Sequence, residues 1–271
     1  MTKLPPTYTE PLPAAFYPAS APLPFSRADF GPDFQWGASA AAYQTEGAWQ
    51  QQGKGPSIWD DFTRRKGAIR RNEHGRVAAD FYNRYETDLD LASSLGLTDF
   101  RFSAAWPRVL PEGTGAVNRR GLDYYDRLVD ACLERDLRPL LTLYHWDLPS
   151  ALQARGGWAN RDIVHWFADY AQLMARRLGD RVPQWCVLNE PMVFVGAGHL
   201  LGVHAPGRRH LGAFLAAAHH ATLAQAEGGR ALRAVLPGSA RIAPRFRART
   251  SLRTAPVMPT TKPPPAAPMP C

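Results

Sequence analysis

Four groups of polar and aromatic residues, far apart in the sequence, carry side chains that could bind and cleave a polar ring. They are residues 43–46, Arg101, residues 145–147 and residues 189–191. Amide and imidazole groups hydrogen-bond hydroxyls, an indole stacks on a pyranose face, and a carboxylic acid protonates a leaving oxygen. Together the four groups indicate a site for carbohydrate chemistry.

Each group lies in, or directly follows, a short apolar segment typical of a β-strand. The candidate strands are residues 34–39, 99–103, 139–145 and 184–189. Between them, helical patterns of apolar residues, mostly at three- and four-residue steps, predict helices over residues 121–134, 160–178 and 211–236. Alternating strands and helices imply parallel strands with helical crossovers. Two α/β architectures fit this pattern, an open doubly wound sheet and a (β/α) barrel.

The placement of the polar groups favours the barrel. No glycine-rich phosphate loop follows the first candidate strand, which removes the main support for a nucleotide-binding open sheet. In a barrel, the carboxyl ends of all strands converge on one site. The four groups are then equivalent in space although they are distant in sequence.

Composition limits the other classes of function. The chain has 271 residues, 45% of them hydrophobic, and a formal charge of +8. Residues 244–271 hold five Arg or Lys and no acid, so the remainder is only +3. No aromatic and basic interleaving accompanies the charge, so we expect no nucleic-acid partner. The N-terminus has no apolar run, which predicts neither a signal peptide nor a membrane span.

The cysteines and the prolines indicate the compartment and the domain limits. Three widely spaced cysteines argue against a disulfide framework or a cysteine metal site, and a reducing cytoplasm fits best. No cofactor or metal is expected, and nothing indicates an oligomeric state. We expect a proline-rich, disordered extension over residues 1–28, a folded domain over 29–242, and a disordered Pro/Arg-rich tail over 243–271.

Seven strings resemble successive signatures of family-1 glycoside hydrolases, the β-glucosidase family. In order they are QWGASAAAYQTEGAW, SIWDDF, FRFSAAWPRVLP, TLYHWDLP, GGWANRD, CVLNEP and GVHAPG. The resemblance covers roughly residues 34–242. It implies a TIM-type (β/α)8 barrel of which the first four to five βα units are present. It also implies hydrolysis of O-glycosyl bonds in β-glucosides and related β-glycosides by a retaining double displacement.

The resemblance also implies roles for single residues. Glu190 is similar to the family's catalytic acid/base, and Asn189 to the residue that bonds the sugar 2-hydroxyl. Gln44, His145 and Trp146 resemble hydroxyl-binding residues of the subsite that holds the cleaved sugar. Arg101 resembles the arginine that keeps the nucleophilic carboxylate ionised.

The sequence departs from the family after Glu190. The family's nucleophile is a glutamate in a downstream TENG-like motif, whereas this chain has a single later acid, Glu227, with no such motif around it. We therefore expect little or no activity and hypothesise a truncation or frameshift near Ile242. Two alternatives are a non-catalytic sugar-binding half-barrel and a non-functional truncated product.

Several residues have plainer interpretations. Glu190 could be an ordinary strand-end carboxylate, His145 a structural histidine, and Arg101 an ion-pair partner of Asp147 or Glu190. The spacing of three histidines disfavours a metal site, and three tryptophans are expected in the core; these are His199, His204 and His210, and Trp106, Trp158 and Trp185.

Overall fold

A single parallel sheet organises the chain, in a computed structural model that describes residues 26–245. Its five strands are hydrogen-bonded in the order in which they occur along the chain. They are β1 (Gly37–Ser39), β2 (Asp99–Ser103), β3 (Arg138–Tyr144), β4 (Gln184–Asn189) and β5 (Arg241–Arg245). All carboxyl ends therefore lie on one side of the sheet.

The strand order decides between the two candidate architectures. In a doubly wound sheet the order reverses after the first strand, whereas here every strand pairs with its successor. Continuous winding in one direction is the construction of a (β/α) barrel. The prediction that the chain forms the first four to five βα units of such a barrel is confirmed.

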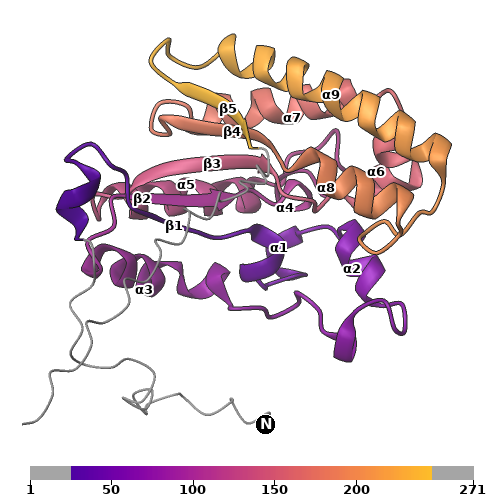
Figure 1. The fold of residues 1–271 in the computed structure, drawn as a ribbon, viewed down its shortest axis with the longest axis horizontal. Coiled ribbons are helices and arrows are strands. Elements are labelled where there is room, and N and C mark those ends of the chain that lie inside the picture. The colour runs from indigo at the N-terminus through magenta and orange to yellow at the C-terminus, as the bar shows by residue number, and fades with distance from the viewer. Residues whose placement is uncertain (1–25, 246–271) are drawn as a thin grey trace, which may run out of the picture.

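Four long helices connect or follow the strands. They are α3 (Phe81–Ser94), α5 (Arg119–Leu133), α7 (Ile163–Leu178) and α9 (Leu211–Arg233). Helix α9 packs along α7 beside β4 and β5, whereas α3 lies at the β1 end of the layer (Figure 1). The helices thus cover the sheet in the same order as the strands.

Short helices shape the loops at the carboxyl ends of the strands. The α-helical turns are α1 (Ala42–Thr45), α2 (Ile58–Thr63), α4 (Trp106–Val109), α6 (Ser150–Ala154) and α8 (Pro191–Val195). Single 3-10 turns occur at η2 (Arg27–Phe30), η3 (Gln51–Gly53), η4 (Arg70–Asn72) and η5 (Gly157–Ala159), and η6 (Gly196–Leu200) is a π-helix. These loops build the site described below.

All the predicted strands and helices are present, but α3 was not predicted and several ends are shifted. Helix α7 begins at Ile163 and α9 ends at Arg233, each three residues inside its predicted bound. The first strand begins at Gly37, three residues later than expected, because only Gly37–Ser39 pairs with β2. Its expected start at Phe34 instead packs in a cluster with Phe30 and Trp36. Strand β5 continues through Pro244 to Arg245. The predicted extension and tail otherwise lie outside the described residues.

Three tryptophans form the centre of the core, as predicted. Trp106, Trp158 and Trp185 are fully buried, and each indole N–H has an oxygen partner about 3 Å away. Trp106 also stacks on Tyr170, with ring centroids 4.8 Å apart. Burial of apolar surface on this scale, with the polar N–H satisfied, is the main source of stability for the helix layer.

Candidate active site

The backbone at Glu190 turns sharply out of strand β4. Glu190 has φ 46° and ψ 61°, the left-handed region, and the next residue, Pro191, begins α8. A non-glycine residue pays roughly 1 kcal/mol or more for this conformation. The turn breaks the alternation of the strand and leaves the half-buried carboxyl at the carboxyl end of the sheet.

Asn189, one residue earlier, connects two other predicted site residues. Arg101 Nη2 donates to Asn189 Oδ1 at 2.6 Å, and Asn189 Nδ2 lies 3.1 Å from His145 Nε2. Because arginine can only donate, the amide oxygen must face Arg101 and the amide nitrogen must face His145. In a neutral imidazole Nε2 is then the acceptor, and the ring proton resides on Nδ1.

Arg101 is held in place from a second side. Its Nε donates to Thr142 Oγ1 on β3 at 3.0 Å, so the guanidinium spans β3 and β4. Two neutral groups, the Thr142 hydroxyl and the Asn189 amide, thus help to orient its head.

Trp146 ties the end of β3 to the end of β4. Its backbone is also left-handed, with φ 81°, and its Nε1 donates to the backbone oxygen of Asn189 at 2.9 Å. The indole and the His145 ring lie edge to face with centroids 5.0 Å apart. Two strained turns, at Trp146 and Glu190, therefore face each other across adjacent strands.

Gln44, on α1 after β1, completes the set on the other side. It lines a pocket of about 400 Å³ together with His145 and Trp146. The other lining residues are Tyr43, Trp59, Thr63, Ile69, Glu73, His74, Gly75, Ala78 and His204. The structure thus gathers all the predicted site residues at the carboxyl ends of the strands: Gln44, His145 and Trp146 in the pocket, and Arg101, Asn189 and Glu190 on the neighbouring strands.

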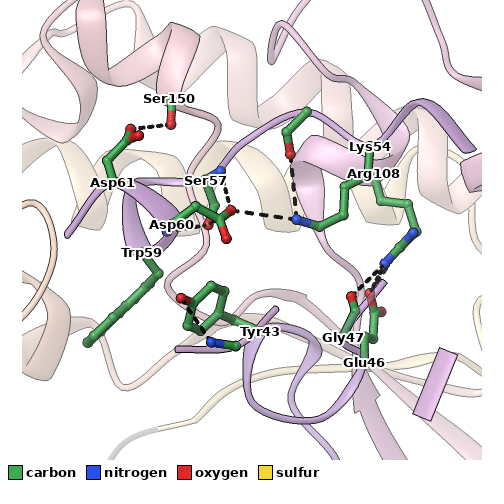
Figure 2. Close-up of polar contacts among 12 residues, drawn as sticks. Tyr43, Glu46, Gly47, Lys54, Ser57, Trp59, Asp60, Asp61, Arg108 and Ser150 are labelled. Carbon is green, nitrogen blue, oxygen red and sulfur yellow. Dashed lines mark hydrogen bonds and ion pairs between the residues drawn. The ribbon is translucent and has the colours of Figure 1, made fainter. Parts of the chain in front are cut away.

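Glu46 belongs to the first polar group, but its side chain forms buried contacts that stabilise the fold. Its buried Oε2 lies 2.9 Å from both Nε and Nη2 of Arg108 (Figure 2). Tyr125 OH donates to Oε1 at 2.6 Å. Burial, then the neighbouring Glu46 charge, raises the pKa of Tyr125 well above its usual value. A carboxylate so fully engaged holds the loop after β1 on α4 and α5.

A second buried network anchors the loop that follows Trp146. Ser57 caps α2 by accepting from the Asp60 N–H, and Lys54 Nζ lies 3.7 Å from Asp60 Oδ2 (Figure 2). This segment is joined to the loop after β3, because Ile58 N–H donates to the Leu148 oxygen at 2.8 Å and Ser150 Oγ donates to Asp61 at 2.5 Å. The Trp146 turn is thereby fixed.

Asp147 lies between these networks and is buried. Neither carboxyl oxygen has a hydrogen-bond partner within residues 26–245. Burial raises the pKa of Asp147 to about 7, with Lys54 acting in the opposite direction. At neutral pH this side chain is therefore near its midpoint of ionisation.

Sequence reasoning missed part of the pocket wall. His204 was considered only as a metal ligand, a role that its spacing disfavoured. Its ring lies between Trp59 and Trp146, with centroids 5.4 and 5.6 Å away. Burial lowers the pKa of His204. Within residues 26–245 no group of three or more His, Cys, Asp or Glu is arranged to hold a metal ion. Trp59 also lines the pocket. The aromatic residues within 58–62 were the sequence feature that could have indicated this.

The parallel sheet is wound in one direction, and polar side chains lie at the carboxyl ends of its strands. These two features define part of a (β/α)-barrel protein with a candidate active site at those ends. Comparison with known proteins gives the family. The model of glycosyl hydrolase family 1 matches residues 26–262, and the chain belongs to that family.

Similar proteins with known names support this family assignment. The chain is 47% identical to β-glucosidase A of Thermotoga maritima over 204 residues, which are 75% of this chain and 46% of the relative. It is 48% identical to a β-glucosidase of Agrobacterium sp. over 210 residues, 78% of this chain and 46% of the relative. The solved family-1 β-glucosidase of T. maritima superposes with a TM-score of 0.77 at 46% identity, over 79% of this chain and 48% of that one. The chain therefore spans about half the length of its relatives.

Proposed function

We propose that the chain carries the acid/base half of a retaining β-glycosidase site, with Glu190 as the proton donor. The observation that carries this is the Asn189 bridge: one amide contacts both Arg101 and His145, and Glu190 follows it on a strained turn. Strain at a non-glycine residue concentrates where chemistry requires a particular geometry. Relatives at 47% and 48% identity that are β-glucosidases support β-glucosides as the substrate class.

The roles of the other residues follow from their positions. Gln44, His145 and Trp146 line the pocket and would bind the sugar hydroxyls and ring face, and Asn189 would bond the 2-hydroxyl. Arg101 would support a nucleophilic carboxylate, because its cationic head faces the carboxyl end of the sheet beside Asn189. Glu190 would protonate the glycosidic oxygen and then activate water.

This chain by itself should turn over little or no substrate. A retaining mechanism needs a second carboxylate about 5 Å from the first. Glu227, the single acid after Glu190, lies on α9 in an ion pair with Arg230. Loss of one member of a cooperating catalytic set removes several orders of magnitude in rate.

Release of nitrophenol from 4-nitrophenyl β-glucoside tests this proposal. We expect turnover at the level of a Glu190→Gln variant, because neither protein can complete the double displacement. Turnover well above that variant, or a covalent adduct with a 2-fluoroglucoside, would show that a nucleophile is present.

The second candidate function is sugar binding without turnover, favoured by the pocket that Gln44, His145 and Trp146 share. Quenching of tryptophan fluorescence by glucose or cellobiose would detect it. The third, a non-functional product, predicts insolubility on expression.

For the location we propose the cytoplasm, supported by the buried free thiol of Cys132 in the described part of the chain. Across residues 26–245, no helix has the length and apolar character needed to cross a bilayer.

A further inference from the structure

The two loops that wall the pocket carry a large net positive charge. Residues 64–76 contain six Arg or Lys and one acid, Glu73, and residues 201–210 contain Arg208 and Arg209 and no acid. Their combined formal charge is +7, whereas the rest of residues 26–243 is −4. The charge is therefore concentrated at one place on an otherwise acidic domain.

Both loops contribute directly to the pocket. Ile69, Glu73 and His74 come from the first loop and His204 from the second. The loops also touch each other, because a β-carbon added at Gly207 would come within 2.6 Å of Arg65 Nη1. The two loops, here called the basic rim, thus meet at Arg65 and Gly207 and border the same pocket.

Part of the first loop is fixed, and part presents its charges to solvent. Arg64 and Arg76 both lie over the Trp49 ring, with guanidinium carbons 5.6 and 4.7 Å from its centroid. Arg70 and Arg71 are exposed at the tip, where Arg71 has φ 60°. The Asn72 side chain closes this tip by accepting from the Gly67 N–H at 3.3 Å. The tip is therefore a built turn with two outward cations next to the pocket lining.

We propose that this basic rim selects β-glycosides whose aglycone carries an anionic group such as a carboxylate. The inference rests on the proposed function, because it requires the sugar to occupy the pocket at Gln44, His145 and Trp146. An anion on the aglycone would then lie towards the rim, where two loops with a net charge of +7 attract it. A neutral aglycone gains nothing from these charges.

The test compares two ligands of similar shape, phenyl β-glucoside and 4-carboxyphenyl β-glucoside, by quenching of the fluorescence of the intact chain, since Trp59 and Trp146 line the pocket. At about 20 mM salt we expect the carboxylate to bind roughly tenfold more tightly, and at about 300 mM salt we expect most of that gain to vanish. The double variant Arg70→Glu/Arg71→Glu should lose the gain and keep the affinity for phenyl β-glucoside.

The matched control is Arg119→Glu/Arg120→Glu, which makes the same change in net charge at an exposed pair outside the pocket lining. It should keep the preference for the carboxylate. Equal affinity for the two glucosides, or a preference that survives Arg70→Glu/Arg71→Glu, would overturn the inference. A gain seen for glucose 6-phosphate in place of the carboxyphenyl glucoside would also overturn it, since the anion would then sit on the sugar. Failure of phenyl β-glucoside alone to bind would count against the proposed function instead.

Discussion

The Asn189 side-chain nitrogen lies 3.1 Å from His145 Nε2, while the oxygen of the same amide accepts from Arg101. One neutral group thus sets the orientation of a cation and of an imidazole that come from two other strands. A substitution at Asn189 should therefore affect the whole end of the sheet.

Replacement of Asn189 by alanine should lower stability by about 1–3 kcal/mol, because Arg101 loses the acceptor for Nη2 in a partly buried position. It should also weaken quenching by glucose. Urea denaturation followed by circular dichroism measures the first effect. The control is Asn83→Ala, at an exposed position of α3, which should change stability by less than about 1 kcal/mol. Equal losses in the two variants would contradict the bridging role.

Replacement of Glu46 by glutamine should destabilise the domain by roughly 3–5 kcal/mol, because the buried Arg108 guanidinium would lose its counter-charge. Glu134→Gln is the matched control, since Glu134 is exposed and its ion pair with Arg135 spans 3.7 Å; we expect a change below about 1 kcal/mol there. Thermal denaturation of both variants decides the matter, and a Glu46→Gln protein as stable as the control would rule out a stabilising role for the pair.

Asp147 should make stability fall as pH rises. Its folded pKa, about 7, lies above the value of 3.8 for an ordinary aspartate, so its contribution is fully present below pH 4 and is lost as pH rises towards 7. The expected loss is on the order of 4 kcal/mol. Asp147→Asn should remove this slope, and exposed Asp169→Asn should leave it unchanged. Denaturation midpoints between pH 4 and 8 that shift in parallel for all three proteins would refute the assignment.

His199 should act in the opposite direction at acid pH. Burial lowers its pKa to about 4, below the usual 6.5, so its neutral form stabilises the fold above pH 6.5 and that stabilisation is lost as pH falls towards 4. A His199→Gln variant should flatten the acid limb of the stability profile relative to the exposed control His219→Gln. Identical acid limbs in the two variants would show that another group is responsible.

The sequence predicted the parts of the fold whose burial is periodic. Helices α5, α7 and α9 and strands β2 to β4 were found because their apolar residues repeat at the spacing of a buried face. Helix α3 was missed, since only four of its residues are buried and its other face is highly charged. The start of β1 was misplaced because Phe34 and Trp36 are as apolar as strand residues.

The places of the candidate site residues in the fold could be predicted, but their contacts could not. Arg101 and Asn189 are 88 residues apart, and no local pattern shows that the arginine bonds this amide. The position of His204 in the pocket wall could not be predicted for the same reason, because it depends on packing of its ring against Trp59. The assigned catalytic and binding roles, and the domain limits at residues 28 and 242, stay predictions.

Strands β1 and β5 each pair on a single side within residues 26–245, and both run in the same direction. Each edge strand has a row of backbone N–H and C=O groups that no strand pairs. The row on β5 is complementary to the row on β1, as at every other strand boundary of this parallel sheet. Further barrel strands would cover both rows at once. Until such strands pair there, the free row of one molecule is complementary to the free row of another, so end-to-end association should increase with protein concentration.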